Sequence, residues 1–359
     1  MIYLDNAATT PLCNAAKDAI MKHFDDYGNP SSVHEFGHKS QLLIEDARET
    51  IAKYINAEPD EIFFTSGGSE SNTWATRERL FLTSPVEHHS INIDCTDKNS
   101  IDIDGNCNLE VVDQEFFGIY DGISWMYVNN EIGAIYPIQK LTQIAHSWGR
   151  IIHTDAVQAM GHIPIDVKEL NIDMLSASAH KFGGVKGCGF LYVKNGIEID
   201  KLINGGGQEN GMRGGTENVL GIISMAAALK DACDHMEERN AHIKRLRDRM
   251  LEQLLTVPGS HLNGALENRT VSNINIRFDG VSGSRLVTLC DLHSICISAG
   301  SACNEGASEP SHVLKAIGLS DEQALSSIRI TIGYQNTETE INTAARMIAQ
   351  LVERIRQHD

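Results

Sequence analysis

The sequence predicts an α/β protein with a mostly parallel sheet, and three observations support that prediction. Short apolar runs typical of buried strands recur between residues 61 and 193, and amphipathic segments with helical spacing lie between them. The chain has 359 residues, which is more than one small core requires. We therefore expect a large domain at residues 14–239 and a smaller one formed by residues 1–13 and 240–359.

The elements of the large domain follow from local patterns. Apolar residues repeat at helical spacing over residues 43–55, and a short strand pattern follows at residues 61–66. Another helix is expected at residues 141–148 because its apolar positions recur with helical spacing. The remaining strands are expected at residues 125–128, 151–154, 174–178 and 189–193.

The connection to the smaller domain is expected to be helical. One long helical pattern runs from Val219 to Met250 and bridges the two domains. The smaller domain then combines a strand at residues 272–278 with an amphipathic terminal helix at residues 341–355. This mixture predicts an α+β architecture for the smaller domain.

The charge and composition of the chain exclude several classes of protein. The net charge of −18 repels polyanions, and the sequence gathers no basic patch, so direct nucleic-acid binding is not expected. The first residues contain no basic start followed by an apolar stretch, and no run of about 18 apolar residues occurs elsewhere. We therefore expect a cytoplasmic protein without a membrane span.

The cysteines do not form a metal-binding pattern. The chain has eight of them and no Cys-x-x-Cys pair, so neither a structural zinc site nor a thioredoxin-like motif is indicated, and no metal is expected. Cys303 differs from the others because small residues such as Gly300, Ala302 and Gly306 surround it. We expect a mobile, exposed thiol there, able to reach a substrate and then another protein; the alternative is an ordinary surface cysteine.

The strongest chemical signal is a lysine at the end of an apolar strand pattern. Lys181 follows Ser178-Ala179-His180 and precedes a pair of glycines, a position where a lysine can lose its proton and bind a carbonyl carbon. Upstream, Asp155 closes another apolar run with a carboxylate. Together the two residues indicate pyridoxal phosphate, with an amine that binds the cofactor and an acid that keeps the pyridine nitrogen protonated.

Other strand ends offer groups suited to the same cofactor. Gly67, Gly68 and Ser69 lie where a strand turns into a helix, and they offer a phosphate backbone N–H groups, a hydroxyl and the positive end of a helix. His88 follows another strand pattern, where a flat imidazole can stack on a pyridine ring and move protons near neutral pH. Taken singly, the glycine pair would indicate a tight turn and the histidine a surface residue.

Two further side chains are suited to a substrate carboxylate. Asn130 supplies an amide at a strand end, and Arg329 is a guanidinium flanked by apolar residues. For Arg329 the alternative is an internal ion pair with an acidic side chain, which is a real competitor in an acidic protein.

A set of ordered motifs covers nearly the whole chain. The motifs are Tyr3-Leu4-Asp5-Asn6-Ala7-Ala8-Thr9-Thr10, Gly28-Asn29-Pro30-Ser31-Ser32, Phe64-Thr65-Ser66-Gly67, Glu87-His88, Val128-Asn129-Asn130-Glu131-Ile132-Gly133, His180-Lys181, Arg213-Gly214-Gly215-Thr216-Glu217-Asn218 and Ser301-Ala302-Cys303. This set resembles the cysteine desulfurases of the NifS/IscS type, in the class-V aminotransferase family. The resemblance implies a pyridoxal-phosphate-dependent fold of type I, with a mostly parallel seven-stranded sheet in the large domain, and a homodimer.

The resemblance also implies roles for individual residues. The cofactor is expected to be held by Lys181, Asp155, Gln158, His88, Gly68, Ser69, Ser178 and His180, together with Thr216 of the second subunit. Arg329, Asn130 and Asn29 are expected to bind the carboxylate of L-cysteine. The expected catalytic residues are Lys181, His88 and Cys303. Cys303 would attack the substrate sulfur and carry it as a persulfide, leaving L-alanine.

The chain departs from the family pattern in two respects. It is shorter than typical relatives between Asn72 and Glu87 and between His88 and Asn130, so peripheral elements of the large domain are expected to be trimmed. It also ends at Asp359, soon after its final helix, where several relatives carry a tail that docks the iron–sulfur scaffold. The sulfur-acceptor protein is therefore left open among an iron–sulfur scaffold, a tRNA-thiolation protein and a cofactor-biosynthesis enzyme.

Two other functions stay open from the sequence. One is a selenocysteine lyase or another class-V β-eliminase or aminotransferase, which would use the same lysine and aspartate without requiring Cys303 for turnover. The other is a cofactor-free scaffold that binds a partner protein, although the complete set of Lys181, Asp155, His88, Arg329 and Cys303 argues against it.

Overall fold

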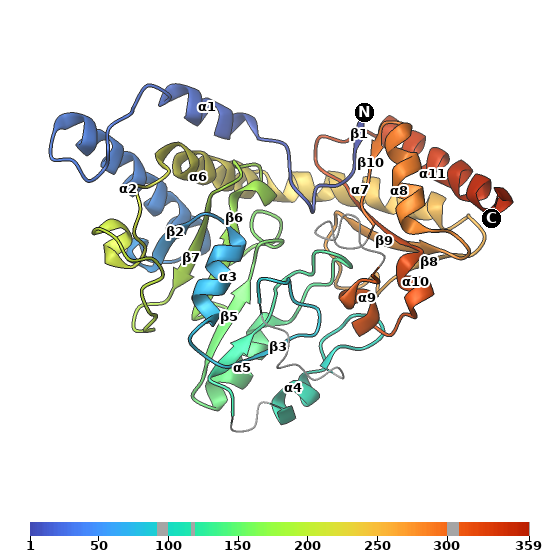
Figure 1. Ribbon diagram of the computed structural model, residues 1–359, viewed down its shortest axis with the longest axis horizontal. Helices are drawn as coiled ribbons and strands as arrows, with labels where there is room; N and C mark the ends of the chain where they lie inside the picture. Colours follow the sequence, from blue (N-terminus) through green and yellow to red (C-terminus); the bar gives the residue numbers. More distant parts are fainter. Residues whose placement is uncertain (92–99, 116–118, 300–308, 359) are drawn as a thin grey trace.

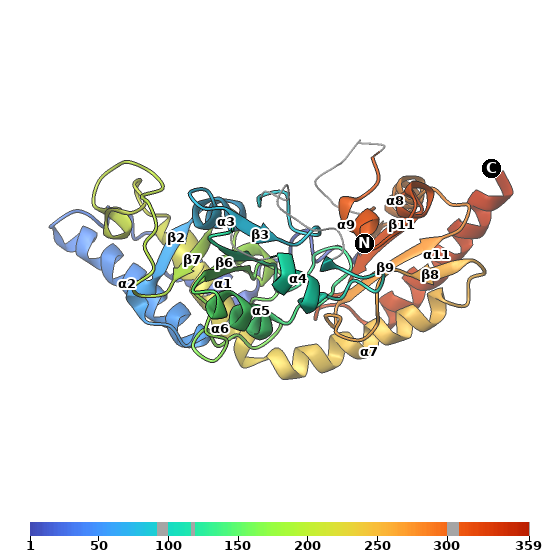
Figure 2. The ribbon, with the colours of Figure 1, turned by 90° about the horizontal axis from the view of Figure 1, so that it is seen from below.

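The structure is a computed structural model that describes residues 1–91, 100–115, 119–299 and 309–358. Figure 1 shows two parts, one built around a large sheet and the other around a smaller sheet, with helices packed against both. The long helix α7 (Met236–Leu254) runs between the two parts (Figure 2). No helix in the described part of the chain is both long enough and apolar enough to cross a membrane.

A six-stranded sheet forms the centre of the first part, with the strand order β2-β7-β6-β5-β4-β3. The strands are β2 (Ile62–Thr65), β3 (Phe81–Thr83), β4 (Gly122–Ser124), β5 (Ile151–Asp155), β6 (Met174–Ser178) and β7 (Gly189–Val193). Neighbours from β3 to β6 are parallel, whereas β7 is antiparallel to both β6 and β2. The predicted mostly parallel sheet is confirmed.

The sheet has six strands among the described residues, rather than the seven that the family resemblance implied. The edge strand is β3, and the connection from β3 to β4 is one of the segments that the sequence showed to be short. Its described residues form α4 (Leu109–Glu115) and an isolated bridge between Ile101 and Cys107, and neither adds to the sheet. A shortened connection at the edge is a physical reason for a smaller sheet.

Helices cover both faces of the large sheet. They are α1 (Asn14–Lys22), α2 (Glu35–Ile55), α3 (Gly68–Thr76), α5 (Ile138–Ser147) and α6 (Val219–Asp234), with short 3₁₀ turns η1 (Pro59–Glu61), η3 (Ala179–Lys181) and η4 (Gln208–Gly211). α2 carries the predicted apolar repeat and ends at Asn56, whose left-handed conformation (φ of 57°) stops the helix. α3 packs against β5, β6 and β7, and α5 packs against β4 and β5.

The second part contains an antiparallel sheet with the strand order β11-β9-β8 and a separate parallel pair of β1 and β10. Its strands are β1 (Ile2–Tyr3), β8 (Ser260–Leu262), β9 (Asn273–Phe278), β10 (Ile295–Cys296) and β11 (Ser327–Thr331). Its helices, besides α7, are α8 (Gly283–Leu292), α9 (His312–Ala316), α10 (Asp321–Leu325) and α11 (Glu338–His358). The predicted α+β mixture and terminal helix are confirmed.

Two sequence predictions about single elements were wrong. The strand expected at residues 125–128 ends at Ser124 instead, and the chain then leaves the ladder while Trp125 and Tyr127 still donate backbone hydrogen bonds to β5. The single helix expected from Val219 to Met250 is two helices, because His235 leaves the helical conformation with a φ of −111° and a ψ of 11°. This break lets α7 run in a new direction toward the second part (Figure 2).

Among the described residues, two large hydrophobic cores and a smaller third cluster around Trp74 and Leu191 hold the molecule together. The first contains Trp125, Leu141 and Phe190 from the region of the large sheet, and the second contains Leu246 and Ile276 from α7 and β9. The short helix α9 inserts side chains into the first core, although it lies within residues 240–359. The two cores are typical of two structural units, while the predicted domain limits stay a prediction.

A close backbone crossing supports the edge of the sheet where parallel strands end. A Cβ atom at Gly189 of β7 would lie 2.5 Å from the carbonyl oxygen of Ala177 and 2.7 Å from the Cα of Gly67. Gly67 precedes α3, so β7, β6 and the start of α3 approach one another only because residue 189 has no side chain.

We predict that Gly189→Ala destabilises the protein because the added methyl group forces apart two backbone segments. The expected loss of unfolding free energy is about 1–3 kcal/mol, the range for overpacking, measured by urea unfolding. Gly207→Ala is the matched control, since a Cβ there meets no atom within 4 Å. Equal stability of Gly189→Ala and the wild type would contradict the prediction.

Candidate active site

A cavity of about 280 Å³ lies at the carboxyl ends of β5 and β6, beside the first turn of α3. This edge of a parallel sheet is where α/β proteins usually bind ligands. The residues from the sequence predictions that line it are Lys181, Asp155, Gln158, His88, Gly68, Ser69, Ser178, His180, Asn130 and Arg329. The structure therefore brings together residues that are up to 261 positions apart (Gly68 to Arg329).

Two predicted residues, Thr216 and Asn29, do not line this cavity, and a third lies outside the described residues. Thr216 lines a separate pocket with Ser66 and Arg213. Asn29 is exposed in the loop between α1 and α2, where its side chain accepts a backbone hydrogen bond. Cys303 lies outside the described residues. Within one chain neither Thr216 nor Asn29 reaches the cavity, so a role for either residue there requires a second subunit.

Asp155 is a buried acid at the end of β5, held by two donated hydrogen bonds. Its Oδ1 accepts the backbone N–H of Val157 at 2.9 Å, and its Oδ2 accepts the side-chain amide of Asn72 at 2.7 Å. The same amide donates to the hydroxyl of Ser90 at 2.9 Å. These bonds hold the carboxylate at the cavity wall in one orientation and connect it to the segment that carries His88.

His88 is held in one tautomer by the same network. The backbone N–H of Ser90 donates to its Nδ1 at 3.2 Å, so a neutral ring carries its proton on Nε2. Burial lowers the pKa of His88; the Asp155 carboxylate opposes this effect and Lys181 adds to it. The ring is therefore neutral at neutral pH. Burial also lowers the pKa of His180, to about 4, with further lowering by Lys181.

The start of α3 forms a cradle that fits a phosphate group. A Cβ at Gly68 would lie 2.5 Å from the side chain of Val157 and 3.6 Å from that of Ser178, so residue 68 has no room for a larger side chain. No side chain of the described residues caps the N-terminus of α3, which leaves the N–H groups of its first turn available to an anion. With the amine of Lys181 and the acid of Asp155 in the same cavity, these donors fit pyridoxal phosphate.

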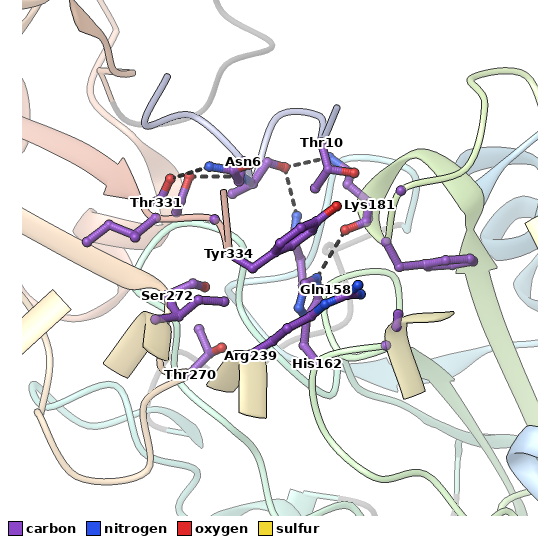
Figure 3. Close-up of a pocket in the computed structure, with 18 of the residues that line it drawn as sticks. Asn6, Thr10, Gln158, His162, Lys181, Arg239, Thr270, Ser272, Thr331 and Tyr334 are labelled. Carbon is purple, nitrogen blue, oxygen red and sulfur yellow. Dashed lines mark hydrogen bonds between the residues drawn. The ribbon is translucent and has the colours of Figure 1, made fainter. Parts of the chain in front are cut away.

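Lys181 lies between this cavity and a second one of about 70 Å³. Figure 3 shows the second cavity, whose wall includes Lys181, Gln158, Arg239 and Tyr334. The Nζ of Lys181 donates hydrogen bonds to the carbonyl oxygens of Ala7 at 2.6 Å and Ala8 at 2.9 Å. The N-terminal segment therefore positions the amine at the wall of the larger cavity.

Arg329 comes from the other part of the molecule and reaches the same cavity from β11. It is 2% exposed. Its Nη2 donates to the Asp5 carboxylate at 3.0 Å, and its Nη1 donates to the carbonyl oxygen of Asn130 at 3.0 Å. The buried Nε has no hydrogen-bond partner among the described residues. The internal ion pair that the sequence left open is thus present, and the guanidinium also lines the cavity.

Sequence reasoning missed several polar residues of the cavity wall. They are Asn72, Glu87, His89, Glu131 and His312. Glu87 immediately precedes the predicted His88, and Asn72 lies four residues after Gly68, one turn along α3, so both were within reach of the motifs that were noticed. His312 had no such signal, because only the fold brings α9 to this edge of the sheet.

The chain is similar to known proteins over nearly its whole length. The family model for aminotransferase class-V matches residues 2–343. Cysteine desulfurase IscS from Methanosarcina thermophila is 40% identical over 375 residues, which cover 99% of this chain and 93% of that protein. A solved NifS-like protein superposes with a TM-score of 0.91 at 32% identity and covers 98% of this chain and 99% of its own.

A further solved structure, described as "SspA in complex with cysteine", superposes with a TM-score of 0.81 at 31% identity, covering 94% of this chain and all (100%) of its own. The match of the family model extends over nearly all the elements that build the cavity, from the N-terminal segment to α11. The chain belongs to the class-V aminotransferase family.

Proposed function

We infer that the protein is a pyridoxal-phosphate-dependent cysteine desulfurase, which converts L-cysteine to L-alanine and holds the sulfur as a persulfide on Cys303. The observation that carries this conclusion is a single cavity lined by Lys181, Asp155, His88 and Arg329. Relatives named cysteine desulfurase match almost the whole chain, and one solved neighbour has cysteine bound. When bound, pyridoxal phosphate supplies an electron sink for the bonds at the amino-acid Cα.

The cofactor is assigned to residues at the ends of β5 and β6 and the start of α3. Lys181 would supply the amine that binds the cofactor covalently, and the Asp155 carboxylate would accept a hydrogen bond from the pyridine nitrogen and so keep that nitrogen protonated. Gly68, Ser69, Ser178 and His180 would hold the phosphate through N–H groups and polar side chains, and Gln158 would bind the ring hydroxyl. His88, neutral and held by Ser90, would pack on the ring.

The substrate is assigned to the wall where the two parts of the molecule meet. Arg329 and Asn130 bind the carboxylate of L-cysteine, supported by the position of both residues at the cavity. Burial strengthens such an interaction because water competes less for the charged groups.

Cys303 carries out the transfer of sulfur. Its thiolate attacks the substrate Sγ, a sulfur–sulfur bond forms, and the Cβ–Sγ bond of the substrate breaks. The electron pair of the broken bond stays with the substrate carbon skeleton, which takes up a proton and leaves as L-alanine. The enzyme keeps one sulfur atom as a persulfide, so no external oxidant or reductant is required before delivery to an acceptor protein.

A cytoplasmic location of the protein stays a prediction.

The subunit arrangement is proposed to be a homodimer. Tyr27 and Phe36 stack at 5.5 Å between ring centroids, yet they are 81% and 56% exposed. Phe24 and Val33 of the same region are exposed as well. An exposed aromatic cluster is typical of a protein contact, and a second copy would also bring Thr216 or Asn29 to the cavity that they do not reach in their own chain.

We predict that Cys303→Ser abolishes sulfur transfer while the cofactor stays bound, because the thiol and the lysine perform separate tasks. The assay incubates the holoenzyme with L-cysteine and measures alanine, protein-bound sulfane sulfur and cofactor absorbance. Cys188→Ser is the control, since that thiol is buried in the first core. Normal turnover by Cys303→Ser would contradict the function and favour a β-eliminase or aminotransferase.

We predict that Arg329→Lys raises the KM for L-cysteine by about tenfold or more, because an ammonium cannot reproduce the planar guanidinium donors. Cofactor absorbance should stay unchanged, since Arg329 is assigned to the substrate. Arg356→Lys in α11 is the control, because the bonds of Arg356 within the described part of the chain go to the backbone carbonyls of residues 258 and 279. A change of cofactor affinity without a change of KM would contradict the assignment of Arg329 to the substrate carboxylate.

We predict that Tyr27→Asp combined with Phe36→Asp yields a monomer in sedimentation velocity, because two charges would be placed within the proposed contact. Leu255→Asp is the control, since Leu255 is an exposed apolar residue at the end of α7. An unchanged dimer in the double variant, or a wild-type monomer, would refute the proposed contact.

A further inference from the structure

Glu87 is a fully buried carboxyl beneath the cavity, with an exposed fraction of 0%. Its Oε1 accepts two hydrogen bonds, from the hydroxyl of Ser84 at 2.7 Å and from the backbone N–H of Met126 at 2.8 Å. Its Oε2 is also buried and has no hydrogen-bond partner among the described residues. A buried oxygen without a donor is unfavourable for an ionised carboxylate, whereas a protonated oxygen places no full charge there.

No described cation forms an ion pair with this carboxyl. The titratable groups that face it are Asp155 on β5 and Tyr136, both of which are acids. His88 follows it in the chain, and His312 of α9 contacts its backbone carbonyl rather than its side chain. Burial raises the pKa of Glu87 to about 8; hydrogen bonds from Ser84 and Met126 oppose this effect, and Asp155 adds to it. The carboxyl is therefore neutral at neutral pH.

Glu87 joins three walls of the cavity. Its side chain binds the backbone of Met126, which continues from β4 and lines the cavity. Its carbonyl oxygen accepts the Nε2–H of His312 at 2.9 Å, which anchors α9. His88, the next residue, lines the third wall. A change at residue 87 would therefore reach the imidazole of His88, the end of β4 and the start of α9 together.

We propose that Glu87 is a positioning residue that acts as a neutral carboxylic acid, holding the segment of His88 against the end of β4, and that its ionisation loosens the cofactor site at alkaline pH. An ionised Glu87 would place a second buried negative charge near Asp155, the residue assigned to the cofactor ring. Repulsion between the two carboxylates, together with the hydration that an ionised Glu87 requires, would then separate the cavity walls that the neutral acid joins. The part that concerns catalysis rests on the proposed function.

The test compares the wild type with Glu87→Gln and Glu87→Ala as holoenzymes. An uncharged amide keeps the shape and acceptor oxygen of the neutral acid, so Glu87→Gln should retain cofactor affinity within about threefold, whereas Glu87→Ala, which loses both hydrogen bonds, should lose about tenfold or more. Cofactor absorbance after dialysis between about pH 6 and pH 9 should fall for the wild type above about pH 8 but not for Glu87→Gln. The alkaline limb of alanine formation should disappear in the same variant.

The thermal unfolding midpoint gives a readout that does not depend on desulfurase activity. The pKa of Glu87 is higher in the folded protein than in the unfolded chain, so the folded state binds more protons between the unfolded value of 4.5 and about 8. The unfolding midpoint of the wild type should therefore fall through this pH window relative to that of Glu87→Gln. The difference between the two midpoints should stop growing above about pH 8. Glu61→Gln is the control, since Glu61 is another buried acid but lies outside the cavity.

Two results would overturn the proposal. One is a Glu87→Gln variant as defective in cofactor binding as Glu87→Ala, which would mean that the charge is required. The other is a midpoint gap between wild type and Glu87→Gln that does not change with pH. If alanine formation is absent in every variant while the gap and the cofactor retention behave as expected, the desulfurase function fails and the neutral acid stands.

Discussion

The parallel pairing of β5 and β6 is the constraint on which the candidate site depends. Asp155 is paired with Ser176 in the register of the two strands, and β6 ends two residues later at Ser178, just before the turn that carries Lys181. Because parallel neighbours end at the same edge of a sheet, the acid and the amine arrive at one cavity. The start of α3 approaches the same edge across Gly189, which completes the cavity with a phosphate cradle.

The N-terminal segment links this edge to the second part of the molecule. β1 pairs with β10, and Asp5 forms a bridge with Thr331 of β11, so the segment begins as part of the smaller unit. It then crosses to the large sheet, where the carbonyl oxygens of Ala7 and Ala8 accept hydrogen bonds from Lys181. Asp5 also pairs with Arg329. One short stretch of chain therefore positions the amine and the guanidinium relative to each other.

Much of the site was predictable because its residues stand at strand ends with distinctive neighbours. Lys181 and Asp155 each stand at the end of an apolar run and carry a charged group there, and Gly68 follows another such run as part of a glycine pair. The bond network around them was not predictable, since the amide of Asn72 meets Asp155 and Ser90 only after three separate elements pack together. The break at His235 escaped notice for a similar reason, because both helices continue the same apolar spacing.

The sequence by itself determined the alternation of strands and helices, the acidic net charge and the chemical identity of the cofactor-binding groups, because these depend on residue type and on spacing along the chain. Only the tertiary structure decided that Arg329 meets Asp5, that Glu87 is buried with its Oε2 unpartnered among the described residues, and that Thr216 and Asn29 lie away from the cavity of their own chain. Those outcomes depend on which distant segments become neighbours, and the packing of two cores, rather than any local pattern, sets those contacts.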